Sequence, residues 1–550
     1  MSTKANFRWD EVRADNPLFS AARTTIETAF YGNNVVKVNS LKEAYKLAKN
    51  SPGTIVTDMP VERPEEIGLD EDAKILVFND GAVFGRTAAA RRIAGEPGVD
   101  VKDLCTKIRD AVYNTRYKKM YHAQAYIGLD KDFMVKAHML LPEGEENLMY
   151  NWLLNFQYIT DEYTKMYKDS KPMENEGDIY FFADPSWSHP DHPLGLAFFD
   201  PTHNCAAVLG MRYFGELKKG TLTLAWGIAN RNGYASCHGG QKRYNLENGR
   251  KFVAGVFGLS GSGKSTITHA KHGGKYDVTV LHDDAFVIST ENGSSVALEP
   301  SYFDKTQDYP LMSPDNKYLL SVQNVGATID ENGKTVIVTE DLRNGNGRAI
   351  KSKLWSPNRV DKFDEPVNAI FWLMKDPTMP PILKIKGAAL SSAMGACLAT
   401  KRTTAERLAP GVDPDALVFE PYANPFRTFP LSQDYLKFKA LFEERNVDCY
   451  ILNTGFLMDK KITPAVTLGC LEAVIEDRAT FKKWANFSDF EIMEVEGFVP
   501  DMNDPEYKSQ LTARMKDRLE FIKSRDEAKG GFDKLPAEVE EVIAKVISEL

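Results

Sequence analysis

Cysteine is scarce in this chain: there are six in 550 residues, and none forms a C-x-x-C pair or lies close to another along the sequence. Small secreted domains depend on dense, paired cysteines, whereas cytosolic proteins keep their thiols reduced. The scarcity and the wide spacing therefore argue against a disulfide framework. We expect a reduced protein that works in the cytoplasm.

Long apolar runs and an excess of positive charge are also missing. No run approaches the roughly 20 apolar residues of a membrane-spanning helix, and residues 1–12 lack the apolar core of a signal peptide. Lys and Arg number 68 against 77 Asp and Glu, which gives a formal net charge of −9. A nucleic-acid surface needs a basic face. We therefore expect neither a membrane partner nor a nucleic-acid partner.

The chain is long enough for two or three domains with a large buried core, and it contains no internal repeat. Residues 1–235 mix a predicted helix at 41–50 with predicted strands at 74–78 and 221–226. From residue 505 the chain is highly charged, and its apolar residues recur at helical spacing, which predicts docked amphipathic helices over 505–550. These apolar residues are Leu511, Met515, Leu519, Ile522, Val539, Ile543 and Val546.

The strongest positive signal is a glycine-rich stretch of the form G-x-x-x-x-G-K-[ST], which follows a predicted buried strand at 252–257. In such a loop the backbone N–H groups surround phosphate, Lys264 reaches the β- and γ-phosphates, and Ser265 joins the Mg²⁺ shell. The alternative is a glycine-rich turn with a chance lysine, but the strand before and the helix after favour a nucleoside triphosphate site. Its residues are Gly258, Leu259, Ser260, Gly261, Ser262, Gly263, Lys264, Ser265 and Thr266.

Acidic residues follow the next predicted strand, at 276–281, which ends in His282-Asp283-Asp284. The carboxyl ends of parallel strands open into the crevice where α/β sheets bind ligands. In P-loop proteins an aspartate at this position holds the metal ion that bridges the phosphates. The alternative is a solvated turn with two aspartates.

Two further segments upstream of the loop offer nitrogen ligands. Lys218 and Lys219 are adjacent, so their mutual repulsion lowers the pKa of at least one and makes a neutral, metal-binding amine possible. His238 offers imidazole, which suits Mn²⁺ better than Mg²⁺. Taken alone, a lysine pair is more often solvated and a single histidine more often structural.

Taken in chain order, these segments resemble the ATP-dependent phosphoenolpyruvate carboxykinases, over residues 77–477. The family loop G-L-S-G-[ST]-G-K-[ST] is matched at every position by residues 258–265, and its Y-x-G-E-M-K-K-G segment by residues 213–220 with leucine in place of methionine. The family's metal-binding histidine falls between these motifs, where His238 is the only histidine. Its D-D pair is matched by Asp283 and Asp284, of which the second would be the metal ligand.

Other segments match the family less closely. Residues 80–87 resemble T-G-x-x-T-G-R-S-P and keep Arg86, and residues 339–343 resemble E-N-T-R and keep Arg343, although a shift of a few positions would select Arg348 instead. Residues 452–456 resemble V-N-T-G-W. Residues 459–462 resemble G-K-R-I, with Lys461 in place of arginine, and an insertion lies at 271–275. The chain thus resembles a divergent member of this family, and the preferred nucleotide is open because lysine cannot stack on a base as arginine does.

The resemblance implies an α/β fold of two domains with mixed sheets and an active site in the interdomain cleft. Residues 1–235 would form an N-terminal substrate-binding domain, and residues 236–550 a C-terminal P-loop domain that binds nucleotide and metal. Within it, residues 387–411 would form a mobile lid. For the first half of that segment Ala, Leu and Met favour a helix instead.

The implied reaction is the reversible conversion of oxaloacetate and ATP to phosphoenolpyruvate, ADP and CO₂. By the resemblance, Arg86 and Arg343 would contact the substrate carboxylate and the phosphoryl group. Tyr213 would contact substrate or CO₂, and Lys218 would bridge substrate and γ-phosphate. The remaining roles are a Mn²⁺ site of Lys219, His238 and Asp284, a Mg²⁺ contact at Ser265, and a base site of Lys461, Ile462 and Thr467.

Two alternatives stay open. The same scaffold could act on another small carboxylic acid, or with GTP or pyrophosphate, because the departures gather in the base site and the arginine segments. It could also be a non-catalytic nucleotide-binding regulator, which would leave the lysine pair, His238 and Asp284 without a purpose. The oligomeric state has no signal in the sequence.

Overall fold

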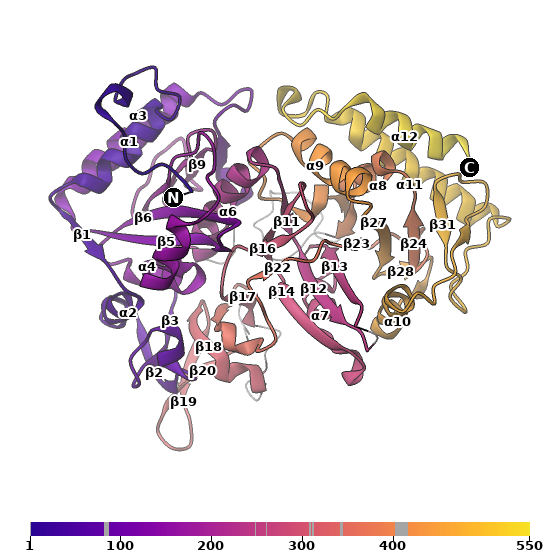
Figure 1. Ribbon diagram of the computed structural model, residues 1–550. Helices are drawn as coiled ribbons and strands as arrows, with labels where there is room; N and C mark the ends of the chain where they lie inside the picture. Colours follow the sequence, from indigo (N-terminus) through magenta and orange to yellow (C-terminus); the bar gives the residue numbers. More distant parts are fainter. Residues whose placement is uncertain are drawn as a thin grey trace.

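The computed structural model describes residues 2–81, 87–247, 249–259, 261–306, 310, 313–340, 345–401 and 416–550. It has an α/β architecture in which helices pack on mixed sheets, as predicted. Figure 1 shows one large sheet on the left, in the indigo to magenta half of the chain, and a second on the right, in the magenta to yellow half. None of the helices described is long and apolar enough to cross a membrane.

The first large sheet belongs to the N-terminal half. Its strand order is β1 (Val35–Val38), β5 (Met120–Asp130), β6 (Phe133–Pro142), β8 (Ile179–Asp184), β10 (Cys205–Leu209), β9 (Leu196–Asp200) and β4 (Arg91–Ile93), and β7 (Gln157–Tyr158) also pairs with β5. Successive side chains point to opposite faces. On β8, Phe181 therefore lies in the core cluster that also contains residues of α2 (Leu41–Lys49), α4 (Glu146–Asn155) and α6 (Phe214–Arg231), whereas Phe182 lies in the cluster with α1 (Ala21–Thr28) and α3 (Val101–Asn114).

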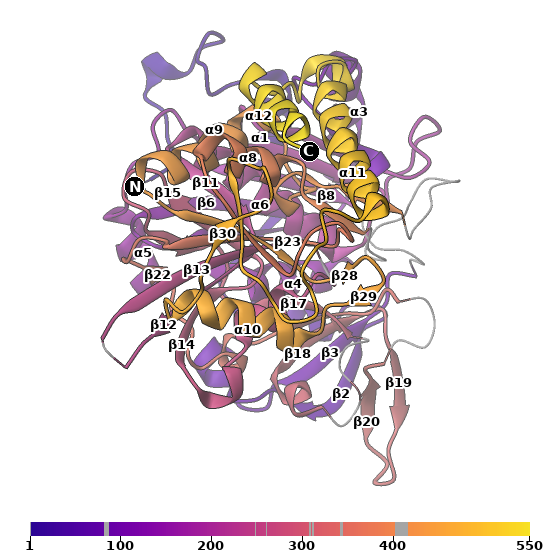
Figure 2. The same cartoon turned by 90° about the vertical axis from the view of Figure 1, so that its right-hand side faces the viewer.

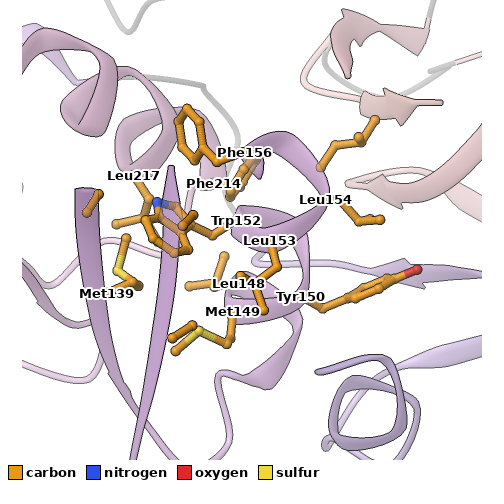
Figure 3. Packing of buried hydrophobic residues seen from close by; sticks show 14 of the residues in the cluster. Met139, Leu148, Met149, Tyr150, Trp152, Leu153, Leu154, Phe156, Phe214 and Leu217 are labelled. Carbon is orange, nitrogen blue, oxygen red and sulfur yellow. The ribbon is translucent and has the colours of Figure 1, made fainter. Parts of the chain in front are cut away.

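The long helix α6 contradicts the predicted strand at residues 221–226. Residues 221–226, expected to form a strand, lie inside it, because the alternation Thr-Leu-Thr-Leu imitates a strand in a helix that is buried on all sides. The buried hydroxyl group of Thr221 has two hydrogen-bond partners. Its Oγ1 donates to Leu217 O at 2.9 Å and accepts from Trp152 Nε1 at 3.0 Å. Figure 3 shows Trp152 of α4 packed against Phe214 and Leu217 of α6. This contact fixes the first turns of α6.

The second large sheet carries the predicted phosphate loop. Its order is β14 (Asp277–His282), β12 (Gly240–Asn245), β13 (Lys251–Phe257), β23 (Ala369–Met374), β27 (Asp448–Asn453), β24 (Ile382–Ile385), β31 (Phe490–Ile492) and β30 (Lys482–Lys483). Strands β13, β23 and β27 are parallel. Since β12 is antiparallel to both β13 and β14, the latter two run in the same direction and end at the same edge. The strands predicted at 252–257 and 276–281 are confirmed.

Helices cover both faces of this sheet. Helices α8 (Ala388–Ala396), α9 (Leu431–Glu444), α11 (Pro505–Ser524) and α12 (Ala537–Ser548) share one core cluster, and α7 (Lys264–His269) and α10 (Pro464–Ile475) belong to the cluster of the other face. In Figures 1 and 2 the yellow helices α11 and α12 lie side by side beyond α8 and α9. The predicted amphipathic helices at 505–550 are thus confirmed, and so is the helix at 41–50, which is α2.

A five-stranded sheet joins the two halves of the chain. Its order is β17 (Tyr302–Lys305), β21 (Arg348–Lys351), β18 (Leu319–Gln323), β3 (Lys74–Phe78) and β2 (Ile55–Pro60), with β18 parallel to β3. The strand predicted at 74–78 is confirmed as β3. A four-stranded sheet of β11 (Tyr234–His238), β15 (Ala285–Ser289), β16 (Ser295–Ala297) and β22 (Lys362–Phe363) lies between the large sheets (Figure 1). The division at residue 235 stays a prediction, and strands from both sides of it share one sheet.

The segment predicted as a lid begins with a helix, as its composition favours. Helix α8 is almost entirely buried, with Leu390 and Met394 in the core and Ser392 bonded to the backbone of α9. A helix held in this way belongs to the rigid part of the sheet's cover. Residues 402–411 of the predicted lid lie outside the described residues, so a lid in that part stays a prediction.

Candidate active site

The predicted phosphate loop has the strand before it and the helix after it that its sequence pattern requires. Strand β13 ends at Phe257 and α7 begins at Lys264. Gly261 and Gly263 adopt φ of +81° and +92°, which a side chain rarely tolerates. At Gly258 a Cβ atom would lie 2.3 Å from Ser262 Oγ, so this position too excludes a side chain. Leu259 and Ser262 are buried, Ser265 and Thr266 are exposed, and Ser260 lies outside the described residues.

Asp284 is the centre of a cluster of nitrogen atoms. Its Oδ2 accepts hydrogen bonds from Lys218 Nζ at 2.6 Å and Lys219 Nζ at 2.8 Å. Its Oδ1 lies 3.1 Å from His238 Nε2 and 3.8 Å from Lys264 Nζ. Residues from four separate segments of the chain therefore meet at one carboxylate, and they include the phosphate-loop lysine and every predicted Mn²⁺ ligand.

Three elements bring these residues together. Helix α6 presents Lys218 and Lys219 from its first two turns. Strand β11 pairs with β15 in a register that sets His238 opposite Ala285, and the N–H of Gly239 donates to Asp284 O at 3.0 Å. Strand β14 ends at His282, directly before the aspartate pair. The cluster thus lies at the carboxyl edge of the nucleotide-site sheet.

The hydrogen bonds of His238 fix its proton. A carbonyl oxygen only accepts, so the contact of Nδ1 with Ala423 O requires the proton on Nδ1. Burial, helped by Lys264 and Lys219, lowers the pKa of His238 to about 3, so the ring is neutral. Nε2 therefore turns a lone pair toward the Asp284 carboxylate at 3.1 Å, an arrangement of two acceptors that a cation would stabilise.

The donor set fits a divalent cation of the Mn²⁺ type. It combines one imidazole, one carboxylate and one amine. In the described part of the chain, no group of three His, Cys, Asp or Glu side chains could hold a metal ion, so this site depends on the amine of Lys219. Burial, together with the charge on Lys218, lowers the pKa of Lys219 to about 8 although Asp284 opposes the shift. A neutral amine is therefore within reach near pH 8.

The two adjacent lysines differ in protonation. Burial alone would lower the pKa of Lys218, but Asp284 and Glu299 together raise it above its usual value. Lys218 Nζ lies 3.0 Å from Glu299 Oε1 as well as 2.6 Å from Asp284 Oδ2. In turn, although burial would raise it, Lys218 and Lys219 hold the pKa of Asp284 well below its usual value. Lys218 therefore stays an ammonium while Lys219 is the lysine that loses its proton more easily.

Two histidines that the sequence analysis did not assign support the aspartate pair. His282 accepts the N–H of Asp284 on Nδ1 at 3.1 Å and contacts Ser301 O through Nε2 at 3.1 Å. Burial lowers the pKa of His282 to about 3, so the ring acts as a neutral brace for the turn. His269 Nε2 lies 3.3 Å from the carboxylate of Asp283, which therefore pairs with the end of α7. Adjacency to the D-D pair was the only sequence signal for His282.

Tyr213 precedes α6 and is largely buried. Its ring lies back over Gly215, where a Cβ atom would come within 2.3 Å of it. Its hydroxyl accepts a hydrogen bond from Arg348 Nε at 3.1 Å. Arg348 was the predicted alternative to Arg343, and it does contact a predicted substrate residue. Arg86 and Arg343 lie outside the described residues, so their roles stay predictions.

The predicted base site follows β27. This strand ends at the same edge as β13, two strands away, and Asn453 at its end fixes the next turn by donating to the carbonyl oxygens of Asp376, Met379 and Phe456. Lys461 is exposed on the short strand β29 (Lys460–Lys461), Ile462 is buried, and Thr467 is buried in α10 with its hydroxyl 3.4 Å from Thr463 O. Their contact with a base stays a prediction.

Comparison with known proteins decides the family. Residues 98–504 match the family model described as phosphoenolpyruvate carboxykinase, which is well over half of the chain. The chain belongs to the phosphoenolpyruvate carboxykinase family. A similar curated protein is the phosphoenolpyruvate carboxykinase (ATP) of Aeropyrum pernix, 27% identical over 338 residues that cover 58% of this chain and 67% of the relative. The resemblance found in the motifs is confirmed, and with it the nature of the chain as a carboxykinase-family enzyme that uses ATP and a divalent metal.

The residues that match the family model include most, but not all, of the predicted site. The cluster around Asp284, the phosphate loop and the base site all lie inside the part that matches the carboxykinase family. The segment of Arg86 precedes it, and helices α11 and α12 follow it. The assignment of Arg86 therefore depends on its local motif alone.

Proposed function

We propose that this enzyme converts oxaloacetate and ATP reversibly to phosphoenolpyruvate, ADP and CO₂, in gluconeogenesis or anaplerosis in the cytoplasm. One observation carries the proposal: Lys218, Lys219, His238 and the phosphate-loop Lys264 meet at Asp284 in a chain of the carboxykinase family. A nucleotide phosphate at Lys264 and a small carboxylic acid at the lysine pair would then lie next to each other.

The proton positions support the proposed metal ligands. Lys219, His238 and Asp284 would hold Mn²⁺, because the lone pair of His238 Nε2 and the Asp284 carboxylate face each other and the pKa of Lys219 is about 8. Ser265, exposed at the start of α7, would join the Mg²⁺ that accompanies the nucleotide. When bound, the Mn²⁺ ion would act as a Lewis acid on the substrate carbonyl oxygen.

The side chains divide the chemistry between them. Decarboxylation breaks the bond between C3 and C4 of oxaloacetate, and its electron pair stays on the product as an enolate. The enolate oxygen then attacks the γ-phosphorus of ATP, the bond from that phosphorus to the bridging β,γ-oxygen breaks, and ADP leaves with its electron pair. Lys218, kept as an ammonium by its two carboxylates, would balance the enolate and the γ-phosphate, and Lys264 would stabilise charge on the transferred phosphoryl group.

Substrate orientation would come from the arginines and Tyr213. Arginine presents two parallel N–H groups to a carboxylate or a phosphate. By resemblance, Arg86 and Arg343 would bind these groups, and Tyr213, whose hydroxyl is fixed by Arg348, would contact the substrate or CO₂. At the base, Lys461 cannot stack as arginine does, so Ile462, Thr467 and the backbone would recognise adenine and discriminate weakly.

The decisive experiment is the reverse reaction of the purified protein. Phosphoenolpyruvate, bicarbonate and ADP should yield oxaloacetate and ATP, with more turnover in Mn²⁺ than in Mg²⁺ alone. ADP should be replaced only partly by GDP. In the forward direction, other keto acids in place of oxaloacetate, or pyrophosphate in place of ATP, should give little product. Tight ATP binding with no turnover in any combination would instead favour the non-catalytic regulator.

A further inference from the structure

Glu299 is a fully buried carboxylate at the edge of the cluster, and the mechanism above does not use it directly. It lies between β16 and β17, and its Oε1 is 3.0 Å from Lys218 Nζ. Its Oε2 accepts a hydrogen bond from Asn155 Nδ2, at the end of α4. All three side chains are completely removed from solvent. Lys218 is therefore held between two carboxylates, Glu299 on one side and Asp284 on the other.

The two carboxylates have different neighbours. Asp284 is surrounded by Lys219, His238 and Lys264 as well as Lys218, so its charge is shared among several groups. Among the described residues, the cation in hydrogen-bonding distance of Glu299 is Lys218 alone. A metal ion at Asp284 would draw on that carboxylate and would also repel Lys218. Glu299 is then the anion that remains dedicated to this lysine.

The geometry of an ammonium group adds a second argument. Lys218 has three N–H bonds and no acceptor. Asp284 Oδ2, at 2.6 Å, accepts one of them, and Glu299 Oε1 forms an ion pair with the ammonium at 3.0 Å. Because a carboxylate lies on either side of the ammonium, the long side chain is already held in place before substrate binds.

We propose that Glu299, braced by Asn155, is a positioning residue that holds the ammonium of Lys218 toward the reacting groups. The inference rests on the proposed function. Stability alone is a poor explanation for the pair, because two charges buried together seldom repay their loss of hydration when compared with well-packed apolar side chains. The ion pair of Lys218 with Glu299 gives the adjacent lysines different roles. Lys218 is directed to the substrate and the phosphoryl group, and Lys219 remains available to the metal.

The test removes the negative charge of Glu299 and keeps the shape of its side chain. In Glu299→Gln, the amide oxygen can still accept from Lys218. Asn155 can flip its amide, because its Oδ1 has no hydrogen-bond partner among the described residues and would accept from the new glutamine. We expect kcat to fall about 10- to 100-fold, because the negative charge that holds the ammonium is lost although an acceptor oxygen remains, with the KM for ATP nearly unchanged. Glu299→Asp, which restores the charge at a shorter reach, should recover part of kcat.

A matched control lies at the other end of the same helix. Glu176 is a buried glutamate that contacts Arg231 Nε at 2.7 Å, Asn204 Nδ2 at 2.7 Å and Asn232 Nδ2 at 3.3 Å, so it too pairs with a cation and with asparagine. Arg231 is 13 residues beyond Lys218 on α6, about 20 Å along the axis. Glu176→Gln should lower the thermal midpoint but leave kcat at the parental value.

The outcomes distinguish the positioning role of Glu299 from the proposed carboxykinase function. Equal kcat in the parent and in Glu299→Gln would overturn the positioning role while the carboxykinase function stands. So would a loss of kcat in Glu176→Gln as large as that in Glu299→Gln, since the effect would then be general destabilisation. If Glu299→Gln does not fold, a Glu299→Asp variant without loss of kcat, or with a rise in the KM for ATP alone, would also overturn it. A parent without carboxykinase activity would overturn the proposed function and this inference with it.

Discussion

Asp284 shares one carboxylate among four nitrogen atoms, and the phosphate-loop lysine is the most distant of them, at 3.8 Å. Lys264 therefore pairs less closely with Asp284 than Lys218 and Lys219 do, and its ammonium group is available to bind a phosphate. Lys264→Ala should lower kcat about 100-fold or more, because a charge aimed at the transferred phosphoryl group is lost. The thermal midpoint should change little.

The control for this substitution is Lys271→Ala, an exposed lysine just beyond α7. Its kcat should equal that of the parent. Both variants are measured in the direction of oxaloacetate formation with saturating ADP and Mn²⁺. A Lys264→Ala enzyme with near-parental turnover would remove the loop from the chemistry.

The lone pair of His238 and the carboxylate of Asp284 give the second prediction at this scale. His238→Gln and Asp284→Asn should each raise the Mn²⁺ concentration needed for half-maximal activity by about 10-fold or more, since one donor is weakened or lost. Binding of the nucleotide, followed by a fluorescent ATP analogue, should stay close to parental. The control is His203→Gln, in the turn between β9 and β10, where the histidine contacts Asp200; this variant should titrate with Mn²⁺ like the parent. Unchanged Mn²⁺ titrations in both site variants would move the metal elsewhere.

Which residues of the cluster a sequence can reveal depends on how they are spaced. Lys218, Lys219, Lys264 and Asp284 lie in short motifs whose spacing alone carries the chemistry, and the structure brings them together. Glu299 and Asn155 have no such pattern, because Glu299 reaches Lys218, and Asn155 reaches Glu299, only after α4, α6 and the loop before β17 have packed. His238 could be selected as the only histidine between two motifs, but its proton position follows from a tertiary contact with Ala423.

At the scale of elements, the predictions held where one face of an element is buried and the other is not. Helices α11 and α12 are of this kind, and so their helical spacing was visible in the sequence. Helix α6 is buried on all sides, so its apolar pattern has no helical period and the stretch 221–226 looked like a strand. Helix α8 is equally buried, but its Ala-rich composition still favoured a helix.

The burial of α8 narrows the lid prediction to the residues that follow β25 (Ala399–Lys401). We expect trypsin to cleave after Arg402 and Arg407 in the free enzyme. Bound ATP together with oxalate, which mimics the enolate, should slow this cleavage at least several-fold, because closure would exclude water that otherwise protonates the enolate to pyruvate. The measurement is mass spectrometry of the fragments over time.

An internal control for proteolysis is the hairpin of β19 (Gly326–Ile329) and β20 (Thr335–Val338), which projects from the molecule (Figures 1 and 2). Cleavage after the exposed Lys334 at its tip should be the same with and without ligands. Equal cleavage after Arg402 and Arg407 in both conditions would argue against a lid in this segment.

At the scale of the whole molecule, the active site depends on strands that are distant in the sequence. The five-stranded sheet pairs β3 with β18 and β21 with β17, so it links residues near the N-terminus to the segment that carries Arg348. No local pattern predicts such pairings, because they depend on which edges remain free after the large sheets have formed. The division at residue 235 stays a prediction, and the five-stranded sheet contains strands from both sides of it.

Buried neutral histidines give the molecule a pH dependence. His122 and His282 lie in the two halves of the chain, and burial lowers the pKa of each to about 3. In the unfolded chain the ordinary histidine pKa of about 6.5 applies. Below pH 6.5 the unfolded state therefore binds protons that the folded state does not. Stability is kept above that pH and is lost as the pH falls toward 3, by up to about 1.4 kcal/mol per pH unit for each histidine.

The thermal midpoint should thus fall steadily between pH 6.5 and pH 4.5. His122 Nε2 contacts His138 Nδ1 at 3.0 Å, and His138 Nε2 contacts Asp178, so His122 is the donor of the first bond and a glutamine amide can replace it. His122→Gln should make the fall shallower, since one proton-binding difference is removed, whereas His189→Gln on a partly exposed turn should leave it unchanged. Differential scanning calorimetry at half-unit pH steps measures both slopes. Parallel curves for the parent and His122→Gln would mean that this histidine takes up its proton equally in the folded and unfolded chain.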